Sequence, residues 1–387
     1  MSLGGARTLV ALGAAAVLVL AGCDEDDGST NVGGPGSAEV QAAIDRAVEA
    51  GAPGIAVRIK SPDRDELLTA GVASLDPSRA ISEGEHSRIA SVTKSFTAAI
   101  TMQLVEEGDL SLDDSVEALT PGLLAAGRRI TIRDLLAHTS GVPDYVKSEA
   151  FGEQVSSGAS LTPEGVLELV ATEPLEFAPG TEYGYSDSDN IALGLIIEEL
   201  TGRSYEDELD ARIIDPLGLE QTTLATEPGV IPDPHFVGYQ FDPEAPAEPP
   251  EDVTDVPIDP NGAWASGALI STPDDVATFF EGLLAGRLVG LEQVEQMMET
   301  TPGGGSPPGP GRNRAGLGIF GWEVSCGEVW GHTGSFPGFR TLGAASADGK
   351  SAIAVFVNAT EVPAELDEAI LDAEELAICR ALGEEAG

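Results

Sequence analysis

Apolar residues recur at helical spacing near the start of the sequence. Val40, Ile44 and Val48 stand at i, i+4 and i+8, the spacing of one helix face, and the stretch "GAPG" follows them. We therefore expect an N-terminal helix over residues 38–52. The segments "GIAVRIK" and "ELLTAGVAS" alternate or run apolar on either side of the turn-like "SPDRD", which predicts a β-hairpin.

Strand signals almost vanish over the next two hundred residues, where apolar residues at helical spacing dominate. Helices are predicted at 91–107, 131–138, 162–172, 190–202, 204–214 and 272–286. Several of these segments open with Thr, Ser or Asp and carry Glu or Asp about three residues later, the pattern of a helix N-cap. Strands are expected again at 327–334, 340–348 and 351–360, and a closing helix at 364–382.

This order of elements predicts an α/β (α+β) fold. An antiparallel sheet flanked by the N- and C-terminal helices would form one part, because such a sheet buries one face under helices. A large, mostly helical region, about residues 90–310, would be inserted into it within one domain over residues 38–383. The Pro- and Gly-rich stretches 242–253 and 301–311 are predicted to be loops.

The first residues have the pattern of a secretory signal. Arg7 precedes an apolar run from Leu9 to Ala21, and small residues precede Cys23. The run is too short for a convincing membrane span. "LAGC" resembles the lipobox of bacterial lipoproteins, which predicts a signal peptide over 1–22, lipid on Cys23 and a flexible tether over 23–37. The chain would then be exported and held on the extracytoplasmic face of the cell membrane by this anchor alone; the alternative is an ordinary signal peptide cut nearby.

Charge and cysteine content narrow the possible functions. The 65 acidic residues exceed the 20 basic ones and give a formal charge of −45, so nucleic-acid binding is not expected, because phosphate contacts need a basic face. The acidic residues spread along the chain and predict a highly solvated surface. Without Cys23, two cysteines remain, and in an oxidising compartment we expect Cys326 and Cys379 to form a disulfide; two buried free thiols are the alternative.

One lysine stands in a segment that otherwise has a core-facing pattern. Lys94 precedes Phe96, Ile100 and Leu104, and a buried lysine is costly unless its charge is paired or suppressed. It follows Ser91 by three residues, so the two side chains would share one helix face and could touch. The pair is a candidate nucleophile and proton acceptor, although an isolated S-x-x-K is more often a helix start with a solvent-reaching lysine.

Two later segments carry the residue types that acyl transfer needs in addition. Tyr185 lies in a polar turn just before a predicted helix, where it could carry a proton or simply pack. His332, Thr333 and Gly334 lie on a predicted strand, where glycine permits close approach of a ligand to the backbone, and Ser335 follows.

The order of these motifs resembles that of the penicillin-recognising serine hydrolases, the β-lactamase-like superfamily. S-x-x-K at 91–94, Tyr-Ser-Asp at 185–187 and His-Thr-Gly at 332–334 are similar to its three motifs. The second and third are closer to serine-type D-Ala-D-Ala carboxypeptidases and class C β-lactamases. The resemblance extends over about residues 40–380 and implies a β-lactamase/transpeptidase-like fold.

The resemblance implies a role for each motif residue. Ser91 would form an acyl-enzyme, and Lys94 would share its proton with Tyr185; which of the two is the formal base stays open. The backbone N–H groups of Ser91 and Ser335 would form the oxyanion hole. Substrate would contact the positions Asp187, His332, Thr333 and Ser335, and His138 would have a structural role behind the site. No cofactor and no metal are expected, since the four histidines are scattered.

Two positions depart from the pattern of the family. The second motif usually reads Tyr-x-Asn, but its third residue here is Asp187. Carboxypeptidases of this kind also have an arginine near the substrate carboxylate, and residues 317–326 contain none; Phe320 and Trp322 occupy that region. Recognition of a C-terminal carboxylate is therefore questionable, unless Asn190 takes the Asn role and Asp187 faces solvent.

Together these observations predict an exported serine hydrolase that acts through an acyl-enzyme. D-alanyl-D-alanine carboxypeptidase is the expected activity. A β-lactamase or esterase of the same fold is the alternative, as is a penicillin-binding surface receptor without turnover. The expected partners are a small peptide, a peptidoglycan stem peptide, a β-lactam or an ester, bound by a monomer.

Overall fold

The computed structural model describes residues 36–125, 127–245, 247–256, 258–302, 304 and 309–383. The predicted signal peptide over 1–22 and the predicted lipid site Cys23 lie outside the described residues. Of the helices in the described ranges, none is both long and apolar enough to cross a membrane.

An eight-stranded sheet forms one part of the molecule. Its strand order is β3-β2-β1-β13-β12-β11-β10-β9, and every neighbouring pair is antiparallel. The strands are β1 (Gly54–Ser61), β2 (Arg64–Leu75), β3 (Ser78–Ala80), β9 (Arg312–Ala315), β10 (Phe320–Val324), β11 (Gly327–Phe336), β12 (Phe339–Ser346) and β13 (Ala352–Val357).

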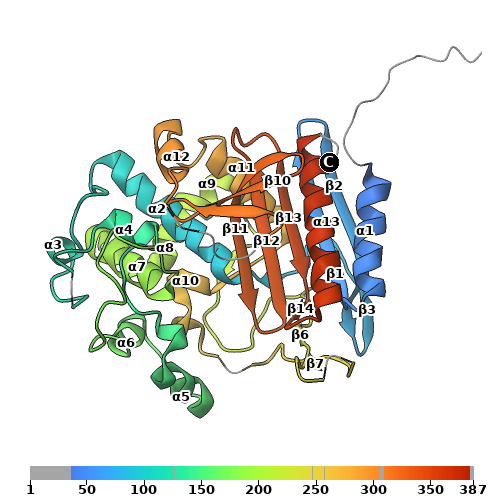
Figure 1. Ribbon diagram of the computed structural model, residues 1–387, viewed down its shortest axis with the longest axis horizontal. Helices are drawn as coiled ribbons and strands as arrows, with labels where there is room; N and C mark the ends of the chain where they lie inside the picture. Colours follow the sequence, from blue (N-terminus) through green and yellow to red (C-terminus); the bar gives the residue numbers. More distant parts are fainter. Residues whose placement is uncertain are drawn as a thin grey trace, which may run out of the picture. The chain divides into compact units, whose positions relative to one another are not determined.

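The two terminal helices cover one face of this sheet. Helices α1 (Ser37–Glu49) and α13 (Ala364–Leu382) pack against each other and against the sheet (Figure 1). Successive side chains of a strand point to opposite faces, so Ile55, Val57 and Ile59 enter the core under α1 and α13. Ala56, between them, belongs to the second core on the other face.

The helical region packs on that other face. Helix α11 (Pro273–Leu284) lies against β12 and β13, with Phe279 and Phe280 fully buried. The other helices of this region are α2 (Thr93–Glu107), α3 (Val116–Leu119), α4 (Ile132–Leu136), α5 (Glu149–Ser157), α6 (Pro163–Glu168), α7 (Asp187–Thr201), α8 (Tyr205–Leu209), α9 (Asp215–Leu217), α10 (Trp264–Gly267) and α12 (Leu291–Met297).

Short elements complete this region. The 3₁₀ turns are η1 (Ala90–Val92), η2 (Tyr145–Lys147) and η4 (Pro260–Gly262), and a π-helical turn, η3, spans Asp210–Ile214. The short strands are β4 (Ser87–Arg88), β5 (Thr223–Leu224), β6 (Tyr239–Gln240), β7 (Glu251–Asp252), β8 (Leu269–Ser271) and β14 (Ala359–Thr360). They form two three-stranded sheets, β14-β6-β7 and β4-β8-β5.

The predicted fold class is confirmed: an antiparallel sheet is flanked by the terminal helices, and helices dominate between β4 and β9. The closing helix begins and ends where the sequence predicts it. Strands almost vanish in the middle of the chain, as predicted. The strands found there, β4 to β8, have two or three residues each, too few for a visible alternation. Strands β9 and β10 were also not predicted, and the first helix ends at Glu49, before Gly51 and Pro53.

Candidate active site

The predicted nucleophile lies on a tight turn between the sheet and a buried helix. Ser91 is the middle residue of η1, which leads directly into α2. Ala90, just before it, has φ of 48°, a backbone conformation that non-glycine residues rarely adopt. Strand β11 passes very close to this turn: a Cβ on Gly334 would lie 2.0 Å from the carbonyl oxygen of Ile89. Only glycine fits there, and this close approach brings the third motif beside Ser91.

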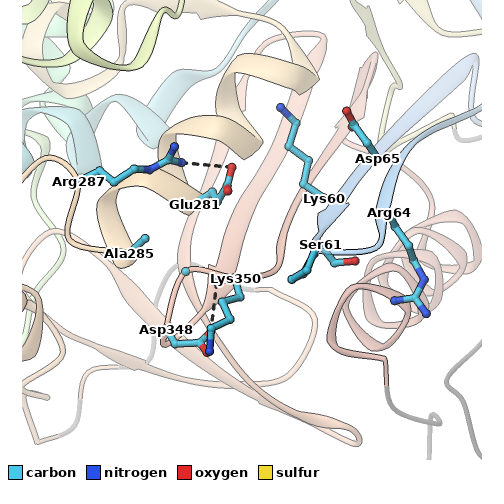
Figure 2. A pocket seen from close by; sticks show the side chains of 11 residues that line it. Lys60, Ser61, Arg64, Asp65, Glu281, Ala285, Arg287, Asp348 and Lys350 are labelled. Carbon is cyan, nitrogen blue, oxygen red and sulfur yellow. Dashed lines mark hydrogen bonds and ion pairs between the residues drawn. The ribbon is translucent and has the colours of Figure 1, made fainter.

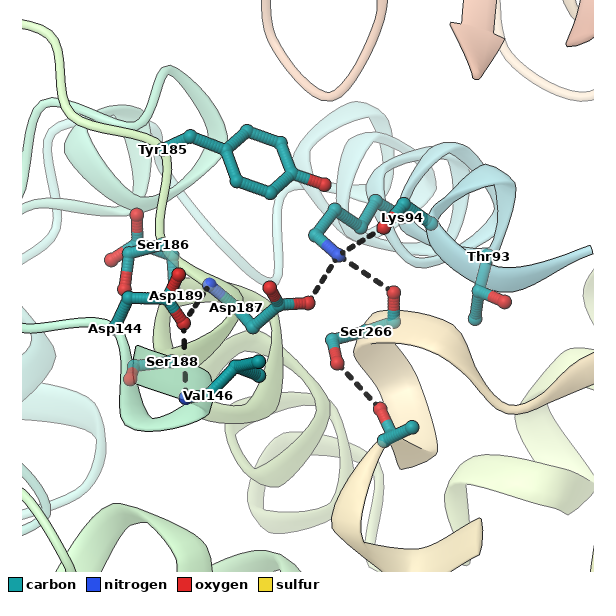
Figure 3. Close-up of polar contacts among 12 residues, drawn as sticks. Thr93, Lys94, Asp144, Val146, Tyr185, Ser186, Asp187, Ser188, Asp189 and Ser266 are labelled. Atoms are coloured by element: carbon teal, nitrogen blue, oxygen red, sulfur yellow. Dashed lines mark hydrogen bonds and ion pairs between the residues drawn. The ribbon is translucent and has the colours of Figure 1, made fainter. Parts of the chain in front are cut away.

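Lys94 is fully buried in the first turn of α2 and donates three hydrogen bonds. Its Nζ lies 3.1 Å from Ser91 Oγ, 2.6 Å from Asp187 Oδ1 and 2.8 Å from the backbone oxygen of Ser266 (Figure 3). Burial alone would lower the pKa of Lys94, but the charge and hydrogen bond of Asp187 together with the contribution of Tyr185 outweigh it, and the net pKa is raised. Lys94 is therefore an ammonium ion whose three N–H groups are all engaged.

Asp187 is held at the start of α7. Its backbone N–H donates to Asp144 Oδ1 at 3.3 Å, and it lies in the first turn of the helix. Its side chain is 18% exposed and forms the ion pair with Lys94. The alternative in which Asp187 faces solvent is thus wrong; Asn190 is buried further along α7.

Tyr185 places its hydroxyl group toward Lys94 (Figure 3). It lines the same cavity as Ser91. The Lys94 Nζ lies 5.1 Å from the centre of its ring. Its hydroxyl oxygen is buried and makes no hydrogen bond of standard geometry among the described residues, yet Ser91 and Lys94 lie close enough to act on it electrostatically. Burial raises the pKa of Tyr185 to about 12, and the charge of Lys94 opposes the rise.

His138 supports Tyr185 from behind. The two rings are 4.5 Å apart between centres. His138 Nδ1 lies 3.0 Å from Asp189 Oδ2, and Ser140 Oγ donates to the other oxygen of that carboxylate at 2.5 Å. Burial raises the pKa of Asp189 to about 6. These contacts tie the turn before α7 to the segment after α4 and fix the ring of Tyr185.

His332 lies on β11 and is fully buried. Its Nδ1 contacts the backbone oxygen of Thr333 at 2.5 Å, so this nitrogen carries the proton. Its Nε2 has no hydrogen-bond partner within the described ranges. Burial, and then the charge of Lys94, lower the pKa of His332 to about 3. His332 is therefore a neutral ring at the position where the K-T-G motif of related enzymes has a positively charged lysine.

Ser91 opens into a cavity of about 280 Å³. The lining residues come from all three motifs and from two further elements: Ser91, Tyr185, Thr333, Gly334, Ser335, Arg340, Asp367 and Leu371. Of the predicted site residues, Ser91, Tyr185, Thr333 and Ser335 line the cavity directly. Lys94, Asp187 and His332 are absent from its lining, and Lys94 and His332 are fully buried.

A larger hollow of about 510 Å³ shares no lining residue with this cavity (Figure 2). It lies where the β1–β2 turn, the β12–β13 turn and the end of α11 meet. Two of its cations already have carboxylate partners in its lining: Arg287 lies 3.2 Å from Glu281, and Lys350 lies 2.6 Å from Asp348. Its size alone therefore does not make it the reactive site.

Sequence reasoning missed three groups of the site. The backbone oxygen of Ser266 binds Lys94, and a backbone acceptor leaves no mark in a sequence. Arg340 and Asp367 line the cavity from β12 and α13, far from the segment 317–326 in which an arginine was sought. The register pairs Ser335 with Arg340, and that pairing could have been found from the "FPG" turn between the two strands.

The remaining sequence predictions concern cysteines and metals. Cys326 and Cys379 form the expected disulfide, with their Cα atoms 5.5 Å apart, and it joins the β10–β11 turn to α13. Among the described residues, no group of three or more His, Cys, Asp or Glu side chains could hold a metal ion.

Comparisons with known proteins agree with this architecture. A solved D-stereospecific amidohydrolase from Streptomyces sp. is 32% identical, with a TM-score of 0.77 over 88% of this chain and 98% of that one. Penicillin-binding protein 4* of Bacillus subtilis is 28% identical over 79% of this chain and 67% of its own length. A provisionally named D-alanyl-D-alanine carboxypeptidase of Salmonella typhimurium is 32% identical over 35% of this chain and 33% of its own length.

The chain thus spans between a third and two thirds of the length of these two curated relatives. The family model described as Beta-lactamase matches residues 40–377, which include all three motifs and most of both helices that flank the sheet. The resemblance to penicillin-recognising serine hydrolases is confirmed, and the chain belongs to the Beta-lactamase family.

Proposed function

We propose that this protein is a serine hydrolase that cleaves amide or ester bonds through an acyl-enzyme on Ser91. The observation that carries the proposal is the contact of 3.1 Å between Lys94 Nζ and Ser91 Oγ, on a serine that opens into a cavity. A buried ammonium ion at this distance stabilises negative charge on the serine oxygen as it attacks.

In the first half of the reaction, Ser91 Oγ bonds to the substrate carbonyl carbon. The N–H groups of Ser91 and Ser335 would stabilise the oxyanion that forms. Lys94 already donates three hydrogen bonds and has no lone pair for the serine proton. The raised pKa of Tyr185 keeps its hydroxyl group protonated, so Tyr185 acts as a relay: its oxygen accepts the serine proton while its own O–H proton passes to the leaving group. The bond to the leaving group then breaks, and the leaving nitrogen or oxygen receives that proton.

In the second half, water attacks the acyl ester on Ser91. The same tyrosine takes a proton from the water and returns one to Ser91 Oγ as the ester bond breaks. A carboxylic acid is released, and the free serine is restored. Every atom needed comes from the substrate, one water molecule and the residues at the cavity.

The site favours substrates without a terminal carboxylate near the second motif. Asp187, when ionised, cannot donate a hydrogen bond to the substrate as an asparagine would, and its charge cancels the attraction that Lys94 would otherwise exert on a carboxylate. Residues 317–326 supply no arginine, and Phe320 and Trp322 are buried there. Amides and esters without a carboxylate are thus preferred over those that carry one, and the 32% identical D-stereospecific amidohydrolase supports amides as a substrate class.

D-alanyl-D-alanine carboxypeptidase activity is the second candidate. It is supported by the relative of that name and by the complete set of reacting groups. We also propose export, lipid attachment at Cys23 and a monomeric state; the support for export and lipid is the pattern of residues 1–23 alone.

Burst kinetics with a p-nitrophenyl ester test the proposal. We expect release of about one equivalent of nitrophenol per protein, followed by steady turnover. Ser91→Ala should remove both phases, whereas Ser156→Ala, at an exposed serine on α5, should keep them. A burst that stops after one equivalent would instead identify a receptor, and undiminished turnover by Ser91→Ala would refute the proposal.

A further inference from the structure

One wall of the cavity is formed by strand β12 and helix α13. Arg340 pairs with Ser335 in the register of β11 and β12, so its side chain lies beside the third motif. Asp367 and Leu371 follow each other at i and i+4 on α13 and line the same cavity. Among the lining residues, the charged ones are Arg340 and Asp367, and both lie in this wall.

The cation of this wall is already bound by two carboxylates. Arg340 Nη1 lies 2.5 Å from Asp367 Oδ1, and Arg340 Nη2 lies 3.3 Å from Glu374 Oε1. Glu374 is almost completely buried, and the side chain of Arg340 is 22% exposed. A guanidinium group held in this way has little positive charge left to offer a substrate carboxylate.

The carboxylate of Asp367 is more exposed than Arg340 and Glu374, the other two members of this cluster. Its side chain is 46% exposed, and the two ion pairs of Arg340 fix its position at the cavity. The other cation of the site, Lys94, is fully buried and paired with Asp187. Both cations are thus neutralised, while Asp367 remains open to a ligand in a chain of formal charge −45.

We propose that Asp367 binds a positively charged amine of the substrate, and that the preferred substrates are amides or esters that carry an ammonium group. Arg340 is a positioning residue that holds the carboxylate in place. This inference rests on the proposed hydrolase function and names its substrate class.

Two matched series of substrates test the inference. In the first, the acyl part is D-alanyl, N-acetyl-D-alanyl or N-succinyl-D-alanyl on one p-nitroanilide leaving group. In the second, an N-acetyl-D-alanyl ester carries choline, its neutral isostere 3,3-dimethylbutanol, or glycolate as the alcohol. The two series separate an ammonium group on the acyl side from one on the leaving side, and kcat/KM is measured for each.

In at least one series, the wild-type protein should prefer the ammonium substrate over the neutral one by about tenfold or more, the effect of one close charge pair at moderate screening. Asp367→Asn should remove this preference and raise the rate with the carboxylate substrate, because Arg340 then loses one of its two partners. Glu368→Gln removes the same charge at the neighbouring exposed position and should keep the preference.

Equal rates for ammonium and neutral substrates in both series would overturn the inference while leaving the hydrolase intact. So would a preference that Asp367→Asn and Glu368→Gln retain equally. The wild-type comparison needs no variant, so it holds even if Asp367→Asn folds poorly. Absence of hydrolysis for every substrate would overturn the proposed function on which the inference rests.

Discussion

Asp187 Oδ1 accepts a hydrogen bond of 2.6 Å from the ammonium group of Lys94, in the position where the family pattern has an asparagine. An asparagine would be a neutral partner, whereas the carboxylate holds Lys94 in its charged form. The same ammonium group lies 3.1 Å from Ser91 Oγ. The second motif therefore affects both the protonation of the site and the charge that a substrate meets.

Asp187→Asn should change the choice between substrates. Removal of the carboxylate leaves the charge of Lys94 free to attract a substrate carboxylate, and the amide can donate a hydrogen bond. We compare kcat/KM for penicillin acylation with kcat/KM for hydrolysis of a neutral ester. The ratio of the two should rise by about tenfold in Asp187→Asn, which corresponds to about 1.4 kcal/mol of transition-state free energy.

The control for this prediction is Glu182→Gln. Glu182 is exposed on the same segment, so its loss removes an equal charge without touching Lys94. An unchanged ratio in Asp187→Asn, or an equal rise in Glu182→Gln, would contradict the electrostatic role of Asp187.

His332 should make the protein sensitive to acid. Its pKa is about 3 in the folded chain, against about 6.5 when unfolded, so below pH 6.5 the unfolded chain binds a proton that the folded chain refuses. The stability due to this group is fully present above pH 6.5 and is lost as the pH falls toward 3. Between pH 7 and 4.5 the loss is about 2–3 kcal/mol.

Thermal unfolding of wild type and His332→Gln across this pH range measures the effect. The Tm of the wild type should fall further, because glutamine does not titrate. The raised pKa of Asp189 acts in the opposite direction but is common to both proteins, so it cancels in the comparison. Parallel Tm curves would show that His332 is not a buried neutral group.

The disulfide between Cys326 and Cys379 should stabilise the sheet against α13. It closes a loop of 53 residues, and the loss of such a cross-link costs about 2–4 kcal/mol. We expect the double variant Cys326→Ser/Cys379→Ser to unfold at lower urea than the oxidised wild type, and reductant to have no effect on the variant. More than one thiol titrated in the unreduced, denatured full chain would disprove the bond, since Cys23 accounts for at most one.

The sequence predicts local features of the site well and distant ones poorly. Three residues of spacing are enough to place Lys94 against Ser91, because one helical turn brings such side chains together. The contact of Lys94 with Asp187 spans 93 positions and followed only from the resemblance, which aligned the motifs in one site. The charged state of Lys94 could be predicted from a carboxylate in the second motif. The neutral state of His332 could not, because it depends first on burial, which the sequence does not show.

The wall of Arg340 and Asp367 shows what the sequence could not reveal. An arginine near the substrate was sought along the chain, but Arg340 reaches the cavity from β12 through strand pairing with Ser335. Its two carboxylate partners, Asp367 and Glu374, lie on one face of α13. The amphipathic pattern of this helix predicts only which of its residues are buried. Only the packing of α13 on the sheet brings these charges to the cavity.

The most direct test of the account is a search for the acyl-enzyme itself. The protein is mixed with a neutral p-nitrophenyl ester, quenched in acid during steady turnover and mapped by peptide mass spectrometry. The account predicts an added acyl mass on the peptide that contains Ser91, and none in Ser91→Ala. Turnover without an adduct, or an adduct on another residue that accounts for the turnover, would contradict it.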